Sequence, residues 1–299
     1  MSRPPFDYTP LPGRPRIEWP DGARVAVWIG LNVEHYAIDE PNLSIVPVTA
    51  GLVPDPANYG WRDYGARVGI WRLSELLERH GFPVSAIVNA EVCERYPEIV
   101  EHGRERGWTW MAHGQRNSVL QTGMDPDEER DYLAAMTATI ERHTGARPRG
   151  WLGPALTETF ATPALLRELG FRYVCDWCND DQPYPLRSEF APMISLPYSI
   201  EANDIPLLAT KGLTGPQYAE VLVDQFDALY EAAADTGLVM AIPLHPFLAG
   251  VPFRLRHVER ALAHVAGRDD VWLASSDAIA DWYLERCYDE AVGLRLSAS

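Results

Sequence analysis

The sequence lacks any apolar run of the roughly 20 residues that a transmembrane helix requires. Its first residues, MSRPPFDYTPLPGRP, also lack the apolar core that is typical of a secretory signal peptide. Internal repeats and low-complexity blocks are absent too, because the 22 glycines and 25 prolines are scattered among expected turns. These absences argue against a membrane protein and a secreted one, and we expect a cytoplasmic protein.

Basic residues are scarce as well. The chain has 26 Lys and Arg against 42 Asp and Glu, which gives a formal net charge of −16 at pH 7 and an isoelectric point near 4.9. Such a charge repels the phosphate backbone of nucleic acids and the headgroups of anionic membranes. We therefore expect neither nucleic acid nor membrane as a partner, and instead a small-molecule substrate.

Cysteine is also scarce, with four residues in the chain. Cys175 and Cys178 form a CxxC motif, a spacing found in zinc half-sites and in redox pairs. A structural zinc needs two further ligands, and the sequence has neither a second CxxC nor an HxxxH motif. The segment also has the pattern of a strand, in which residues three apart point to opposite faces. We interpret the pair as two ordinary thiols.

What the sequence does contain is a regular alternation of short apolar strands with helices, which predicts a parallel sheet. We expect strands at 23–35, 82–89, 107–114, 147–155, 171–177, 192–200, 238–247 and 271–276. We expect helices at 63–81, 91–106, 125–145, 162–170, 215–237, 254–266 and 277–291. This number of units favours a closed sheet. The prediction is an α/β fold, a distorted (β/α)7-8 TIM-like barrel, with one domain at 23–292, a Pro-rich arm at 1–22 and a tail at 293–299.

Polar side chains follow every predicted strand. In parallel barrels the catalytic groups lie at this carboxyl-terminal face. In chain order they are Asn32, Glu34 and His35; Asn89 and Glu91; His113, Gln115, Arg116 and Asn117; Thr157 and Glu158; Asp176, Asn179, Asp180 and Asp181; Glu201, Asn203 and Asp204; His245; and Ser275, Ser276 and Asp277. Their convergence predicts a polar pocket.

Five motifs in a fixed order carry a resemblance to a known family. They are NVEH, YGARVGIWRL, AHGQRNS, GWLGPALTET and LHPF, spread over roughly residues 20–290. In this order the chain resembles the polysaccharide deacetylase (NodB-like) superfamily, and within it most of all the branch of allantoinases and cyclic-imide hydrolases. The resemblance implies the barrel fold, hydrolysis of a carbon–nitrogen bond and a homo-oligomer, a tetramer.

The metal motif of that family is incomplete in this sequence. The family typically has an Asp pair after the first strand and His-x-x-x-His after the third. Here Asn32 and Glu34 stand after the first strand, and His113 is followed by Asn117 where the second histidine belongs. An amide oxygen is a poor zinc ligand. The allantoinase-like branch implies an activity that requires no cofactor. The alternative is a weakly bound divalent metal such as zinc at Glu34 and His113.

Hydrolysis of an amide requires an activated water and a proton for the leaving nitrogen. We expect Glu34 and His113 to act on the water. His245 matches the late histidine of the family, which implies a proton donor, and the proline after it favours an extended backbone there.

Further residues are expected to bind the substrate. Asn32, Arg116 and Asn117 would hold the carbonyl oxygens of a ring, and Trp151 and Trp177 would form its apolar walls. Glu158 has two interpretations, a substrate contact or a cap of the helix that starts near Thr162. Asp180 and Asp181 are interpreted as turn residues ahead of Pro183.

Three functions are consistent with these residues. The favoured one is hydrolysis of a small cyclic amide, imide or ureide. The second is a metal-dependent deacetylase of an N-acetylated sugar or peptidoglycan, acting in carbohydrate metabolism, which would want an export signal and a complete metal triad. The third is a barrel that binds a ligand without turnover, which predicts the loss of Asp at position 32 and of His at 117. Retention of Glu34, His113 and His245 together argues for catalysis.

Overall fold

The structure is a computed structural model that describes residues 3–41 and 46–298, with side chains up to residue 293. The strands are β1 (Val25–Val33), β2 (Val84–Val88), β3 (Thr109–Ala112), β4 (Gly150–Trp151), β5 (Tyr173–Val174), β6 (Tyr184–Pro185), β7 (Ile194–Ser195), β8 (Leu238–Leu244) and β9 (Val271–Leu273). The helices are α1 (Pro56–Tyr64), α2 (Ile70–Arg79), α3 (Ala90–Arg95), α4 (Pro97–Glu105), α5 (Pro126–Thr144), α6 (Thr162–Glu168), α7 (Gly215–Ala232), α8 (Pro246–Ala249), α9 (Pro252–Ala266), α10 (Ser276–Arg286) and α11 (Tyr288–Ala298).

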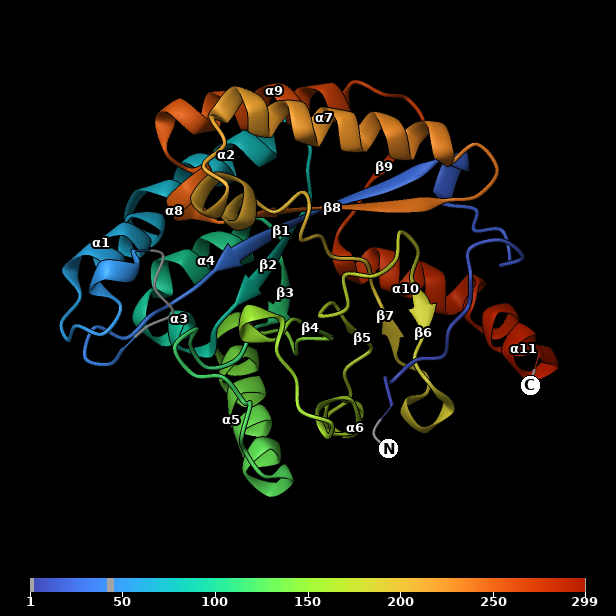
Figure 1. The fold of residues 1–299 in the computed structure, drawn as a ribbon, viewed down its shortest axis with the longest axis horizontal. Coiled ribbons are helices and arrows are strands. Elements are labelled where there is room, and N and C mark those ends of the chain that lie inside the picture. Colours follow the sequence, from blue (N-terminus) through green and yellow to red (C-terminus); the bar gives the residue numbers. More distant parts are fainter. Residues whose placement is uncertain (1–2, 42–45, 299) are drawn as a thin grey trace.

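The strands form one curled sheet in the order β6-β7-β5-β4-β3-β2-β1-β8, and β9 also pairs with β1. All pairings are parallel except that of β6 with β7. Figure 1 shows α7 and α9 side by side over β1 and β8, with α5 on the opposite side of the molecule. This half-barrel confirms the predicted α/β fold, consistent with a distorted TIM barrel.

The central strand β1 shows how the sequence places the site. All nine residues of β1 are buried, and side chains alternate between its two faces. Val25, Val27, Ile29 and Leu31 pack among the helices, whereas Ala26 and Trp28 lie in the separate apolar cluster inside the curl. By the same period of two, Asn32 and Glu34 point into the interior beyond Trp28. The inward face of β1 is thus apolar along most of the strand and becomes polar at its carboxyl-terminal end.

The observed helices differ from the predicted ones where proline or glycine intervenes. The helix expected from residue 63 begins at Pro56, with the Asp55 side chain capping the backbone N–H of Asn58 at 3.2 Å. The helix expected over 91–106 is divided at Pro97, which cannot donate the hydrogen bond that continuity requires. Short elements without a visible period were missed, namely β6, α8 and the π-helical turn at Ile205–Thr210. Helix α11 extends into the predicted tail.

A close backbone contact connects the helical layer to the segment after β8. A Cβ atom at Gly69 would lie 2.0 Å from the carbonyl oxygen of Pro246, the residue after His245. We expect Gly69→Ala to lower the free energy of unfolding by roughly 1–3 kcal/mol, because rigid backbone must move to admit the methyl group. Urea denaturation measures this change.

Gly60 in α1 provides the matched control, because a Cβ there would meet nothing within 4 Å. Gly60→Ala is expected to be neutral or to stabilise by up to about 1 kcal/mol, through helix propensity alone. Equal effects at the two glycines would contradict the close contact.

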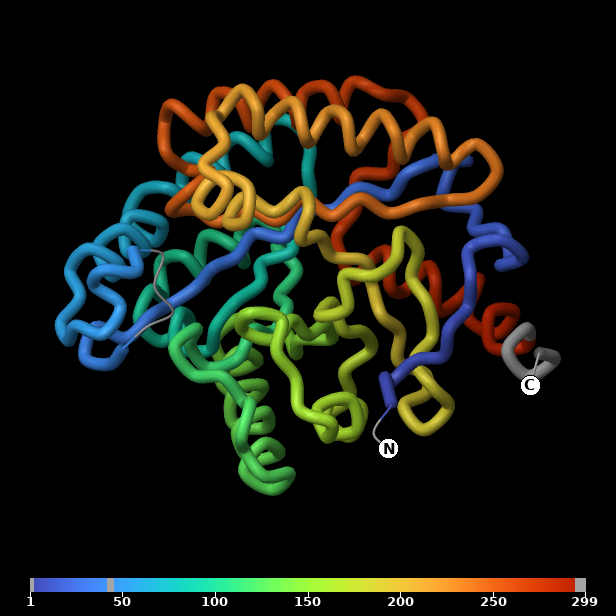
Figure 2. Tube along the Cα trace, viewed as in Figure 1, coloured from blue at the N-terminus to red at the C-terminus, as the bar shows by residue number. Residues whose placement is uncertain are grey.

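The N-terminal arm covers the side of the sheet where β6 lies. Figure 2 shows the arm passing beside β6 and the C-terminal helices. Arg14 makes a two-pronged ion pair with Asp180, with both N–O distances 2.7 Å. Asp180 also accepts the backbone N–H of Gln182 at 3.0 Å, in agreement with its predicted turn role.

Within the described ranges 3–41 and 46–298, β8 at one end of the strand order does not pair with β6 or β7 at the other end. One backbone hydrogen bond crosses this seam of the sheet, from the N–H of Val239 to the carbonyl oxygen of Asp181, at 2.8 Å. Side chains add further links: Nε2 of Gln182 donates to the carbonyl oxygen of Gly237 at 3.0 Å, and the indole of Trp28, on the neighbouring strand β1, donates to that of Pro197 at 3.1 Å. Scattered hydrogen bonds therefore connect the two edges of the sheet on this side.

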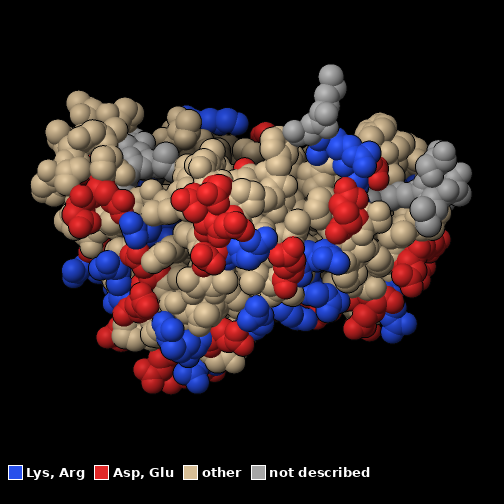
Figure 3. All heavy atoms as spheres, turned by 90° about the horizontal axis from the view of Figure 1, so that it is seen from below, with Lys and Arg blue, Asp and Glu red and all other residues tan. Residues whose placement is uncertain are grey.

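The surface carries charges of both signs. On the face seen in Figure 3, Lys and Arg side chains are interspersed with Asp and Glu side chains. The net negative charge is therefore not gathered in one acidic area of this face. Among the described helices, none is both long and apolar enough to cross a bilayer.

Candidate active site

A cavity of about 680 Å³ lies at the carboxyl-terminal ends of the strands. Five of the predicted site residues line it, namely Asn32, Glu34, His113, Asn117 and His245. The other lining residues are Tyr36, Pro47, Arg62, Leu152, Gly153, Ala155, Leu156, Tyr198, Ile200, Asn203, Ile205, Pro206, Ala209 and Thr210. Its size is typical of small-molecule sites. The structure therefore brings together the catalytic residues that were predicted from the strand ends.

Glu34 is at the centre of the polar groups. Its Oε1 atom lies 3.4 Å from Nε2 of His113 and 3.5 Å from Nε2 of His245. Its Oε2 atom accepts the hydroxyl of Tyr36 at 3.0 Å. Tyr36, His113 and His245 are buried, and the Glu34 side chain is 8% exposed. One carboxylate oxygen is thus shared by two imidazole rings.

The two histidines have different partners at their other ring nitrogen. Nδ1 of His113 lies 2.6 Å from the carbonyl oxygen of Leu152. Because a carbonyl oxygen only accepts, Nδ1 carries a proton, and the neutral ring keeps a lone pair on Nε2. Nδ1 of His245 lies 2.6 Å from Oδ1 of Asp204, whose Oδ2 accepts the backbone N–H of His245 at 2.7 Å. Asp204 is fully buried, with 0% of its surface exposed.

These partners set the charges in the site. Burial alone lowers the pKa of His245, but the carboxylates of Asp204 and Glu34 outweigh it and raise this pKa to about 10. Burial alone raises the pKa of Glu34, but the positive charge of His245 holds this pKa well below its usual range. At neutral pH the His245 imidazolium therefore lies between two carboxylates.

Asn117 does not offer an atom to a metal. Its Nδ2 donates to the hydroxyl of Tyr36 at 3.0 Å, and its Oδ1 accepts from Nδ2 of Asn89 at 2.9 Å. Across the described part of the chain, no three His, Cys, Asp or Glu side chains are grouped so that they could hold a metal ion. The residues present therefore do not fit the metal triad that the family resemblance implies. Asn117 instead fixes the Tyr36 hydroxyl that contacts Glu34.

Asn32 lies on the cavity wall. Its Nδ2 donates to the carbonyl oxygen of Gly30 and to the hydroxyl of Tyr198, each at 3.2 Å. On another wall the guanidinium of Arg62 stacks 3.8 Å above the centre of the Tyr36 ring. Both arrangements orient polar groups that face the cavity.

Arg116, predicted to bind substrate, does not line the cavity. Its Nε and Nη1 atoms each lie 2.6 Å from a carboxylate oxygen, of Glu40 and Glu91 respectively. Glu91 also approaches Nε2 of His35, at 3.7 Å. We therefore revise the role of Arg116: it connects the loop after β3 to the segment after β1 and to the start of α3.

Trp151, Trp177 and Glu158 also lie outside the cavity lining, so the predicted apolar walls are formed by other residues. Trp151 is fully buried, and the Trp177 ring packs against Phe6 of the arm with ring centres 5.0 Å apart. Glu158 is not the cap of α6, whose N-cap residue is Ala161 and has no side-chain cap. The apolar lining comes instead from Leu152, Leu156, Ile200, Ile205 and Pro206.

Sequence reasoning did not assign roles to Asp204, Tyr36 and Tyr198. Asp204 was recognised as polar at a strand end, but it lies 41 residues before its partner His245, so no spacing connects them. Tyr36 had a usable signal, because it lies two residues after Glu34 and so continues the same face of the extended chain.

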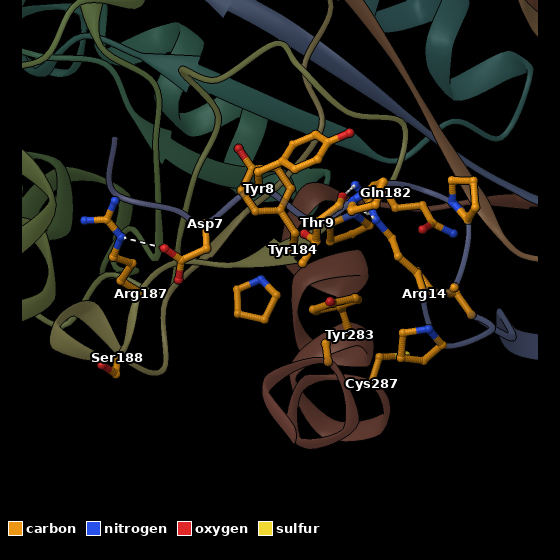
Figure 4. A pocket seen from close by; sticks show the side chains of 18 of the residues that line it. Asp7, Tyr8, Thr9, Arg14, Gln182, Tyr184, Arg187, Ser188, Tyr283 and Cys287 are labelled. Atoms are coloured by element: carbon orange, nitrogen blue, oxygen red, sulfur yellow. Dashed lines mark hydrogen bonds and ion pairs between the residues drawn. The ribbon is translucent and has the colours of Figure 1, made fainter. Parts of the chain in front are cut away.

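A second cavity of about 600 Å³ lies under the N-terminal arm, away from these histidines. Figure 4 shows its wall of Tyr8, Tyr184 and Tyr283, with Cys287 below. Two of its arginines are paired within the protein, Arg14 with Asp180 at 2.7 Å and Arg187 with Asp7 at 3.0 Å. The chemistry-bearing cavity is therefore the one at the strand ends.

Comparison with known proteins connects this site to a family. Residues 61–174 match the family model for polysaccharide deacetylase. A putative polysaccharide deacetylase of Schizosaccharomyces pombe is 26% identical, covering 94% of this chain and 98% of that protein. The crystal structure of a probable polysaccharide deacetylase from Pseudomonas aeruginosa is 29% identical, with a TM-score of 0.83 over 92% of this chain and 96% of that one.

The crystal structure of the allantoinase PuuE is similar to the same degree. It is 27% identical, with a TM-score of 0.83, over 94% of this chain and 99% of that one. Both neighbours share the fold from one end to nearly the other. Residues 61–174 therefore match a polysaccharide deacetylase domain, and the chain is similar over nearly its whole length to polysaccharide deacetylases and to this allantoinase, in agreement with its motifs.

Proposed function

We propose that this protein hydrolyses a non-peptide carbon–nitrogen bond in a small cyclic amide, imide or ureide, by acid–base catalysis. One observation carries the proposal. Two histidines face one oxygen of Glu34, and their different Nδ1 partners give one a free lone pair and the other a proton to donate. Such a pair has the base and the acid that amide hydrolysis requires.

In the proposed reaction, a water bound by Nε2 of His113 and Oε1 of Glu34 attacks a ring carbonyl carbon. The water gives one proton to Nε2 of His113 as its oxygen bonds to carbon. The tetrahedral intermediate then breaks its carbon–nitrogen bond, and the nitrogen takes the proton from Nε2 of His245. The product is one open-chain molecule that has a carboxylic acid at one end and an amide or urea group at the other. Glu34, between both rings, returns the proton from His113 to His245.

The substrate class is argued from the leaving group and the cavity. An imide or ureide nitrogen is stabilised by a second acyl group, so it leaves without the assistance that a plain amide demands. A planar ring fits a cavity of about 680 Å³ whose walls are largely aliphatic. We assign a ring carbonyl contact to the second N–H of Asn117 Nδ2, because Asn32 Nδ2 already donates to Gly30 and Tyr198. The similarity to the allantoinase PuuE over nearly all of both chains supports this class.

The test is a turnover screen by mass spectrometry on purified protein, with and without a chelator. The panel contains cyclic imides, hydantoins and ureides together with N-acetylated sugars. A ring compound that gains one water at an unchanged rate in chelator is the expected result. If every ring compound stays intact while an N-acetyl sugar loses acetate, the proposal is overturned.

Deacetylation of an N-acetylated sugar or peptidoglycan is the second candidate. The family model and the names of the S. pombe and P. aeruginosa relatives favour it. It requires a divalent metal, so it predicts activity that a chelator abolishes and added zinc restores. The committed hydrogen bonds of Asn117 argue against this candidate.

A further inference from the structure

A second pair of acidic groups lies directly behind His113, outside the cavity. Oε1 of Glu158 and Oδ2 of Asp176 are buried and find no hydrogen-bond partner among the described residues, and the same holds for the indole N–H groups of Trp151 and Trp177. Burial raises the pKa of both carboxyl groups, that of Glu158 well above its usual range and that of Asp176 to about 6. The mechanism proposed above uses none of these four side chains.

A single peptide group connects this acid pair to the active site. The backbone N–H of Gly153 donates to Oδ1 of Asp176 at 2.6 Å. The carbonyl oxygen of Leu152, in the same peptide group, accepts from Nδ1 of His113 at 2.6 Å. Hydrogen bonds at the two ends of one amide polarise it cooperatively. A negative acceptor at the N–H makes the carbonyl oxygen a stronger acceptor for the His113 proton.

The local backbone is fitted to this arrangement. A Cβ at Gly153 would lie 2.2 Å from the carbonyl oxygen of Thr157 and 3.2 Å from Oδ1 of Asp176. Ala155 and Leu156 follow with φ of 54° and 55°, a left-handed conformation that non-glycine residues rarely adopt. Strained backbone of this kind is typical of functional sites. The turn thus holds the peptide group against Asp176.

We propose that Asp176 is a positioning residue for His113. Through the peptide group of Leu152 and Gly153, it fixes His113 in the tautomer with Nδ1 protonated and Nε2 free. This inference rests on the proposed function, in which His113 is the base. The titratable groups facing the pair are His113 and Glu129. Burial and the neighbouring Asp176 raise the pKa of Glu158 well above its usual range.

The experiment reads the tautomer directly, by ¹⁵N NMR of selectively labelled histidine, with His113 assigned by the loss of its signals in His113→Gln. The native protein is expected to show His113 protonated at Nδ1. In Asp176→Ala the orphaned peptide group should yield a mixture of tautomers, whereas Glu158→Gln should keep the native tautomer. If Asp176→Ala does not fold, Asp176→Asn, which retains an acceptor without charge, gives the same readout with a smaller change.

Activity provides the second arm. We expect kcat to fall about 10- to 100-fold in Asp176→Ala, with KM nearly unchanged, as for other residues that orient a catalytic group. Asp181→Asn is the matched control, a partly buried carboxyl nearby that does not contact this peptide group. A folded Asp176 variant with native His113 tautomer and native kcat overturns the inference. Because the NMR arm needs no substrate, a failed substrate screen does not obscure it.

Discussion

Replacing Glu34 by glutamine is expected to lower kcat by about 10²- to 10⁴-fold, the usual contribution of an acid–base group. The amide cannot accept a proton from His113 or return one to His245, because it has no negative oxygen at the shared Oε1 position. The substitution also removes one of the two carboxylates that raise the pKa of His245, so His245 loses its proton at a lower pH. Glutamine has the same shape, so the thermal midpoint should change little.

Steady-state kinetics with the substrate from the screen measures this effect. Glu259→Gln is the matched control, because Oε1 of Glu259 lies 3.4 Å from Nε2 of His80, the same separation as between Glu34 and His113. That pair lies at the surface, so its loss should leave kcat unchanged. Full activity in Glu34→Gln would exclude the carboxylate from the chemistry and overturn its proposed role between the two histidines.

Asp204→Asn is expected to have an effect of similar size for a different reason. Asparagine can accept only one of the two hydrogen bonds from His245, and it no longer supplies the negative charge that keeps the buried imidazolium protonated. Removal of that charge lowers the pKa of His245 from about 10. Above the lowered pKa the proton donor is lost, and kcat should fall by about 10²- to 10⁴-fold.

The pH profile separates this cause from simple damage. A general acid works only when protonated, so native activity should decline as the pH rises through about 10. In Asp204→Asn this decline should begin at least roughly 2 pH units lower, and activity should recover in acid. Asp227→Asn, which breaks a surface Asp–His pair with His264 at 2.8 Å, is the control and should keep the native profile. An unshifted profile in Asp204→Asn would show that another group donates the proton.

The same group makes stability depend on pH. Because the pKa of His245 in the folded protein is raised from 6.5 to about 10, its stabilising contribution is complete below pH 6.5 and is lost as the pH rises toward 10. The free energy of unfolding should therefore decrease over this interval in the native protein, and less steeply in Asp204→Asn.

Much of the fold could be predicted because its strands are short, apolar and parallel. β1 is buried on both faces, so its sequence is almost uniformly apolar and marks the centre of the sheet. β6 has only the residues Tyr184 and Pro185 and runs antiparallel, so it is too short for an alternation of apolar and polar residues to reveal it. The N-terminus of α1 was missed although Asp55 and Pro56 are a typical start signal, because the long segment before them has no apolar pattern.

The site was predictable where strand geometry determines direction, and not where loops do. Glu34, His113 and His245 each follow a strand, and parallel strands end at one edge, so their convergence required no further information. Arg116 lies in a loop, where its direction depends on Glu40 and Glu91 from other parts of the chain. Trp151 and Trp177 were assigned to the cavity wall by residue type alone, which does not determine the direction in which their side chains point.

The peptide group between Leu152 and Gly153 has a consequence for how function in this protein is dissected. An alanine scan replaces side chains and leaves every backbone amide in place, so it records the histidine and the aspartate as two unrelated positions. Chemical ligation can replace that amide by an ester, which exchanges the N–H of Gly153 for an oxygen atom. The same exchange makes the carbonyl oxygen of Leu152 a weaker hydrogen-bond acceptor. His113 and Asp176, which look independent in a mutational map, would then prove to be coupled through one peptide group.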